Sequence, residues 1–163
     1  RKDFCVNATE LLDNSHLMVI RALDDLPETE WDTPHVCGEW SIKEIVAHLA
    51  SYEHAQVDAV NTFQGAEPTP YIINLLQNGT AFNAQEVEKR RYDTAQHILD
   101  EYNDTQVQTT SMLAQIPAEK VSQVGTMPWY HKDRSLDDLI TMLYNHTCEH
   151  CMQITAFRVK RNI

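Results

Sequence analysis

Hydrophobic residues recur along the chain with a helical period in four long stretches. The first runs from about Phe4 to Leu26, and the second begins at Ser41 and ends near Gly65. The third extends from about Asn83 to Ile116, and the fourth from Ser135 through Phe157. Apolar side chains return every three or four residues in each, as they do on the buried face of an amphipathic helix. The pattern predicts four helices.

Helix-start signals support these boundaries. Ser41 with Glu44 fits a capping box, Ser135 is a good N-cap, and Asn83 with Glu86 is a further N-terminal signal. Four helices around one core make an all-α, four-helix bundle, and we expect one such domain over residues 1–163. The connections are longer than the loops of a simple up-down bundle. They leave room for crossovers and for a lid, for which the loop residues are candidates: Trp129, Tyr130 and His131.

The net charge of the chain limits the classes of partner that we expect. The formal net charge is −11, which disfavours nucleic-acid backbones and anionic membrane surfaces. No apolar run approaches the length of about 20 residues that spans a bilayer, and the first residues contain no apolar signal core. We therefore expect a cytoplasmic protein that acts on a small molecule, with four free thiols: Cys5, Cys37, Cys148 and Cys151.

Three motifs overlap in the segment "NHTCEHC" at 145–151. The glycosylation acceptor motif at Asn145 would not be modified in the cytoplasm. The pair Cys148-x-x-Cys151 lacks the βαβ context of a redox site, so we expect packing thiols there. That leaves His146 and His150, one helical turn apart.

These two histidines continue the buried stripe of the fourth stretch, between Leu143 and Ile154. Two unpaired imidazoles at core positions are costly, and a metal ion satisfies both at once because residues i and i+4 point the same way. His48, on the inward side of the second stretch, is a candidate third ligand. Three imidazoles leave a position open, which is typical of catalytic sites, and they suit Zn, Ni, Cu or Fe(II). Glu149 is a candidate hydrogen-bond partner of a ligating imidazole, although a solvated surface role is equally consistent with its position.

Three segments together resemble the DinB/YfiT-like family of metal-binding four-helix bundles: "CGEWSIKEIVAHLASYE" (37–53), "FNAQEVEKRR" (82–91) and "SLDDLITMLYNHTCEHCMQITAFR" (135–158). The resemblance implies a metal, most plausibly Zn or Ni, held by His48, His146 and His150. It also implies a low-molecular-weight thiol as co-substrate (bacillithiol, mycothiol or glutathione) of a transferase or isomerase. Asn83 and Arg91 resemble recurrent polar positions, and Arg91 is expected on the inward stripe, either holding an anionic group or snorkelling.

Three functions compete at this point. The leading hypothesis is a metal-dependent S-transferase or isomerase that uses such a thiol. A second is a metal-dependent hydrolase, and a third is a non-enzymatic, stress-induced protein that binds a metal or small molecule. Bundles of this kind often pair through an exposed apolar face, so a homodimer is a further expectation.

Overall fold

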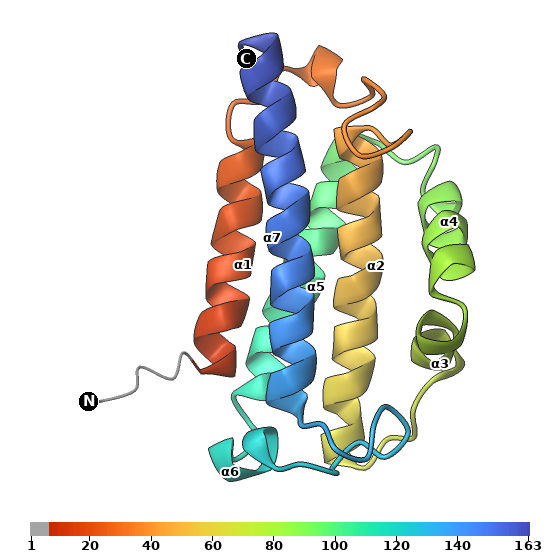
Figure 1. Ribbon diagram of the computed structural model, residues 1–163, viewed down its shortest axis with the longest axis vertical. Helices are drawn as coiled ribbons and strands as arrows, with labels where there is room; N and C mark the ends of the chain where they lie inside the picture. Colours follow the sequence, from red (N-terminus) through yellow and green to blue (C-terminus); the bar gives the residue numbers. More distant parts are fainter. Residues whose placement is uncertain (1–6) are drawn as a thin grey trace.

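The computed structural model describes residues 7–163, which form seven α-helices (Figure 1). Four are long: α1 (Ala8–Leu23), α2 (Ile42–Asn61), α5 (Ala95–Leu113) and α7 (Leu136–Arg161). Three shorter ones lie in the connections: α3 (Pro70–Gln77), α4 (Gly79–Lys89) and α6 (Ala118–Ser122). Two 3₁₀ turns, η1 (Glu28–Glu30) and η2 (Thr62–Gln64), complete the elements. Within the described residues there is no β-strand, so the all-α prediction is confirmed.

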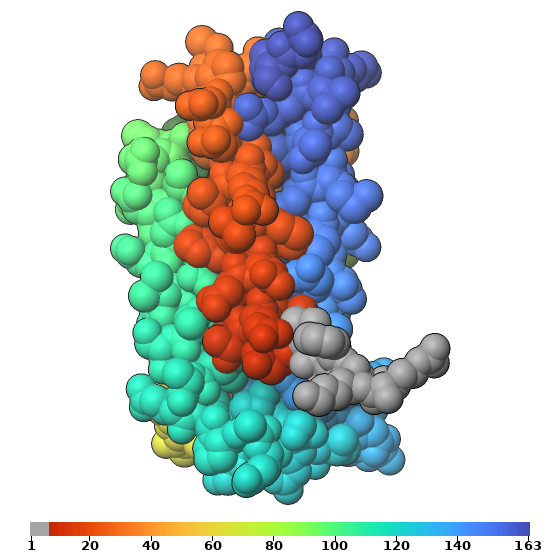
Figure 2. Space-filling view, turned by 90° about the vertical axis from the view of Figure 1, so that its left-hand side faces the viewer, coloured from red at the N-terminus to blue at the C-terminus, as the bar shows by residue number. Residues whose placement is uncertain are grey.

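The four long helices form a bundle in which α1 and α7 run in one direction and α2 and α5 in the other (Figure 1). The helix α2 packs along α5, and α1 packs along α7. Figure 2 shows α1 on the surface between α5 and α7. Because α2 and α5 are parallel, the chain must return to the starting end between them, and α3 and α4 make this crossover outside the bundle.

The helix starts at Ser41 and Ser135 agree with the sequence prediction. Each serine accepts a hydrogen bond from the backbone N–H three residues on, and the carboxylates of Glu44 and Asp138 complete two capping boxes. The second helix also ends where expected, since α2 passes through η2 to Gly65, whose φ of 94° breaks the helix.

Two other boundaries differ from the prediction. The first helix is shorter, because Asn7 caps its start and Asp25, with φ of 50°, follows its end; Phe4 and Cys5 lie outside the described residues. The single third helix from Asn83 to Ile116 is wrong. Its span holds most of α4 and all of α5, separated by a turn at residues 90–94. Thr94 adopts an extended backbone and its side chain accepts from the N–H of His97, so it starts a new helix.

The core is divided into two apolar clusters by a layer of polar side chains. One cluster lies around Val60 and Leu136, and the other around Ile45 and Ile154. Between them, every long helix contributes buried polar residues: Ser15 from α1; His48, Ser51, Glu53 and Gln56 from α2; Thr105, Gln106 and Thr109 from α5; Thr147 and His150 from α7. Buried polar groups cost stability unless they find partners, so this polar layer is where function is to be sought. None of the described helices is long and apolar enough to cross a membrane.

Candidate metal centre

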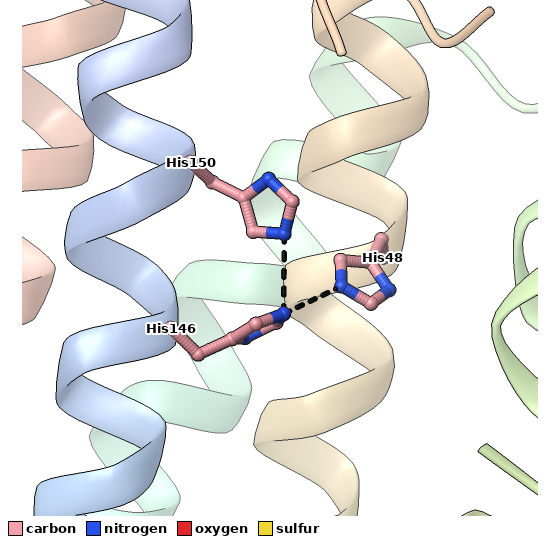
Figure 3. Close-up of side chains that lie close together, drawn as sticks. All are labelled: His48, His146 and His150. Atoms are coloured by element: carbon pink, nitrogen blue, oxygen red, sulfur yellow. Dashed lines mark hydrogen bonds between the residues drawn. The ribbon is translucent and has the colours of Figure 1, made fainter. Parts of the chain in front are cut away.

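The three histidines singled out in the sequence meet at the polar layer. His48 comes from α2, and His146 and His150 come from successive turns of α7 (Figure 3). The Nε2 atom of His146 lies 3.0 Å from Nε2 of His48 and 3.1 Å from Nε2 of His150. One nitrogen from each of the three rings lies within 4.8 Å of the others. In a tetrahedral site with metal–nitrogen bonds of about 2.0–2.1 Å, ligand nitrogens are about 3.3 Å apart, so the cluster has the dimensions of such a site.

Hydrogen bonding alone does not satisfy this cluster. A neutral imidazole has one N–H and one lone pair. His150 Nδ1 lies 2.8 Å from the amide oxygen of Gln153, which can only accept, so the hydrogen of His150 is on Nδ1 and its Nε2 carries a lone pair. His146 Nε2 can donate to that lone pair or accept from His48, but it cannot do both. A divalent cation would take up three lone pairs at once, and the residues therefore fit a metal ion.

Aromatic rings hold the imidazoles in place. The rings of Tyr52 and His146 are stacked, with centroids 4.5 Å apart and planes 23° apart. Trp40, just before the cap of α2, lies 5.0 Å from the ring of His48. The hydroxyl of Tyr52 donates to the side-chain oxygen of Asn83 on α4, at 3.0 Å. Asn83, predicted as a substrate contact, is thus the residue that orients the tyrosine beside the cluster.

Burial keeps the histidines neutral. His48 is only 1% exposed, and desolvation, followed by its two histidine neighbours, lowers its pKa to about 3. Desolvation and His150 lower the pKa of His146 to about 4. The pKa of His150 is also lowered, by desolvation first. Neutral imidazole is the form that binds a metal, so the cluster keeps its lone pairs available well below neutral pH.

These shifts predict that the metal-free protein loses stability in mild acid. The unfolded chain binds protons on these histidines below pH 6.5 and the folded chain does not, so stability falls as the pH drops toward the lowered values. Between pH 7.5 and pH 6 we expect a fall of about 2 kcal/mol in the free energy of unfolding. Urea unfolding in the presence of a chelator measures it. His48→Leu should reduce the pH dependence, and an unchanged slope in that variant would contradict the assignment.

Two predicted site residues lie elsewhere. The inward placement of Arg91 is wrong, because the turn after α4 carries it to the surface, where it pairs with Glu88 at 3.3 Å. Its role toward an anionic substrate stays a prediction. Glu149 is exposed on α7, and in the described part of the chain the hydrogen-bond partner of His150 Nδ1 is Gln153, three residues on. A hydrogen-bond role for Glu149 also stays a prediction.

Among the described residues the buried arginine is Arg90, the neighbour of Arg91. Its guanidinium lies 2.7 Å from Glu86 and 2.7 Å from Glu101. Glu101 also accepts from His54 at 2.8 Å, and Tyr71 donates to Glu86 at 3.0 Å. This network fastens the end of α4 to α2 and α5, and it explains why His54 is not part of the histidine cluster.

The two cysteines of the CxxC motif lie on α7, beside the histidine cluster but not in it. Cys151 is buried in the apolar cluster around Ile45, and the thiol of Cys148 contacts the sulfur of Met18 at 3.9 Å. Both are free thiols, as is Cys37. Their packing role agrees with the sequence-based interpretation.

Sequence reasoning missed Tyr52 and Gln153 as parts of the site. Each had a signal in its spacing, since Tyr52 is one turn after His48 and Gln153 is three residues after His150. A residue that stacks on an imidazole, or that donates a hydrogen bond to it or accepts one from it, must lie close by, but many residues have the same spacing. Only the orientations of the histidine rings in the structure identify Tyr52 and Gln153.

Comparison with known proteins assigns the chain to a family. A family model described as the DinB superfamily matches residues 11–154, which include all three histidines. The chain matches no curated protein and no solved structure.

Proposed function

Since the chain belongs to the DinB superfamily and carries a three-histidine cluster that could bind a metal ion, we propose that it is a metal-dependent enzyme. His48, His146 and His150 hold a divalent ion, Zn or Ni. The reaction we propose is the transfer or addition of a low-molecular-weight thiol, as in an S-transferase or isomerase. The observation that carries the proposal is the convergence of three neutral imidazoles whose Nε2 atoms cannot satisfy one another by hydrogen bonds.

A divalent metal bound there would supply Lewis acidity, lowering the pKa of a thiol or water at its open position. In S-transfer, the thiol sulfur forms a bond to an electrophilic carbon of the substrate. The bond from that carbon to its leaving group breaks, the leaving group takes the electron pair, and the thiol proton passes to solvent. The step needs no oxidant or reductant.

The chain's own residues prepare the site for such a reaction. Gln153 fixes the ring of His150 through Nδ1, so that its Nε2 points to the shared centre. Tyr52 covers one face of His146 and is itself held by Asn83. Because α2 and α7 are anchored by capping boxes and packed cores on both sides of the polar layer, the three imidazoles sit on rigid elements.

We expect the metal-loaded protein to conjugate a thiol to a small electrophile such as monobromobimane faster than the same mixture without protein. Bacillithiol, mycothiol and glutathione are tested in parallel, with the conjugate measured by fluorescence. His146→Ala should lower the rate at least about a hundredfold, since a ligand is lost. His97→Ala, a change on the exposed face of α5, is the matched control and should leave the rate unchanged.

The same assay separates the competing functions. Turnover of activated esters without any thiol would replace S-transfer by metal-dependent hydrolysis. Absence of turnover with every thiol and ester, together with tight metal binding, would replace it by a non-enzymatic binding function.

A further inference from the structure

A further feature of the bundle is an apolar pocket in the apolar cluster around Val60 and Leu136, on the side of the polar layer that Tyr52 shares with the histidine cluster. It has a volume of about 200 Å³ and lies between α2, α3, α7 and the loop before α7. Its wall is formed by twelve residues, none of them charged, among them Tyr52, Gln56, Ile72, Trp129, Leu139 and Leu143. An apolar cavity of about 150 Å³ is large enough to take up a benzene ring. The pocket is therefore large enough for a small organic molecule.

One polar side chain in this wall lacks a partner. Gln56 is 2% exposed, and its Nε2 atom has no hydrogen-bond partner among the described residues. A buried amide N–H without an acceptor costs about 1–3 kcal/mol, and its neighbours in the wall are mostly apolar. If the side-chain amide turns toward the pocket, an acceptor oxygen on a bound molecule removes that cost.

The pocket and the histidine cluster share a wall. His48, Tyr52 and Gln56 follow one another at intervals of four residues, so they form one stripe along α2. Gln56 is two turns beyond His48, about 12 Å along the helix axis. Tyr52 lines the pocket and also stacks on His146. On α7, Leu143 lines the pocket one turn before His146.

We propose that this pocket binds the organic substrate of the metal centre, and that the substrate is a neutral molecule with an apolar body and a hydrogen-bond acceptor that Gln56 recognises. This inference rests on the proposed function, since it places the pocket beside the reacting group. The absence of charge in the wall disfavours an anionic body. Trp129 and Tyr130, the loop residues considered as a lid, form part of the pocket wall.

The test compares two probes of the same shape, acetophenone and α-methylstyrene. Acetophenone has a carbonyl oxygen, which accepts a hydrogen bond, where α-methylstyrene has a methylene group, which does not. Binding is measured in every variant by NMR titration of the Trp129 indole, and also of the Gln56 side-chain amide wherever Gln56 is kept. In wild type we expect both probes to bind. Gln56→Leu should weaken acetophenone binding about fivefold, because the hydrogen bond is lost, and should leave α-methylstyrene binding unchanged or stronger. Gln106→Leu, the same change at a buried glutamine facing Leu12, should alter neither affinity.

A second variant keeps the test decisive if Gln56→Leu does not fold. Gly79 lines the pocket, and a Cβ added there would meet no atom within 4 Å. Gly79→Phe should therefore fold and fill the opening, and both probes should lose affinity at least about tenfold. Thr80→Phe, at the neighbouring exposed position, is its control and should bind both probes like wild type.

Each titration is run with chelator and with saturating zinc, so that the pocket and the metal centre are judged separately. Probe binding in both conditions supports the pocket even if zinc does not bind. Zinc binding without probe binding would overturn the pocket and leave the proposed function standing. Equal losses for both probes in Gln56→Leu, or unchanged binding in Gly79→Phe, would also overturn the inference.

Discussion

Replacing His146 with alanine should lower the affinity of the protein for zinc at least about a thousandfold, or about 4 kcal/mol. His146 is the central member of the cluster, because its Nε2 atom is the one that lies close to both other rings. Its loss leaves only two imidazoles, His48 and His150, to hold the ion. Isothermal titration of the demetallated protein with zinc and nickel measures the effect.

Two further variants sharpen this result. Gln153→Leu removes the hydrogen bond that orients His150, and it should weaken zinc binding about 10- to 100-fold while the ligands remain. His97→Ala changes an exposed histidine of α5 and should bind zinc like wild type. If His146→Ala and His97→Ala bind zinc equally well, the cluster is not the metal site.

Replacing Glu53 with glutamine should stabilise the protein at alkaline pH. Glu53 lies in the polar layer, its Oε2 atom has no hydrogen-bond partner in the described part of the chain, and burial raises its pKa to about 8. At pH 7 the folded protein therefore keeps a proton that the unfolded chain releases above a pKa of 4.5. The contribution of this carboxyl is fully favourable below pH 4.5 and is lost as the pH rises through 8.

Glutamine has nearly the same shape and no proton to lose. We expect Glu53→Gln to raise the free energy of unfolding by about 4 kcal/mol at pH 8 and to have little effect at pH 4.5. Urea unfolding at the two pH values, with chelator present, measures the difference. Glu149→Gln, at an exposed position of α7, should change stability at neither pH. An equal effect of Glu53→Gln at both pH values would show that the carboxyl is not held protonated.

The sequence predicted the bundle and its two best-marked helices because their signals are local. Ser41 with Glu44 and Ser135 with Asp138 need only three residues to make a capping box, and the apolar stripes behind them are uninterrupted. The prediction of a single helix for the third stretch was wrong for the opposite reason. Its apolar period runs on through residues 90–94, although Thr94 caps a new helix there. Continuing the period across that turn placed Arg91 inside, whereas the buried residue is Arg90.

The convergence of the three histidines was predicted because two of them share a helix face and the third faces inward on another helix. The polar layer was not predicted. Helical periodicity shows that Glu53, Thr109 and His150 face the core, but whether they lie at one level depends on how far each helix is shifted along its neighbours. That shift is set by packing between helices that are far apart in the sequence. It also depends on the crossover through α3 and α4, which makes α2 and α5 parallel (Figure 1).

The central claim is that His48, His146 and His150 bind one divalent metal ion through nitrogen. X-ray absorption spectroscopy of the zinc-loaded protein tests it most directly, because it reports the kind and distance of the atoms around the metal. We expect three imidazole nitrogens and a fourth nitrogen or oxygen ligand, all at about 2.0–2.1 Å, with the imidazole signal reduced in His146→Ala. A sulfur shell at about 2.3 Å would instead place the metal on the cysteines of α7 and contradict the account.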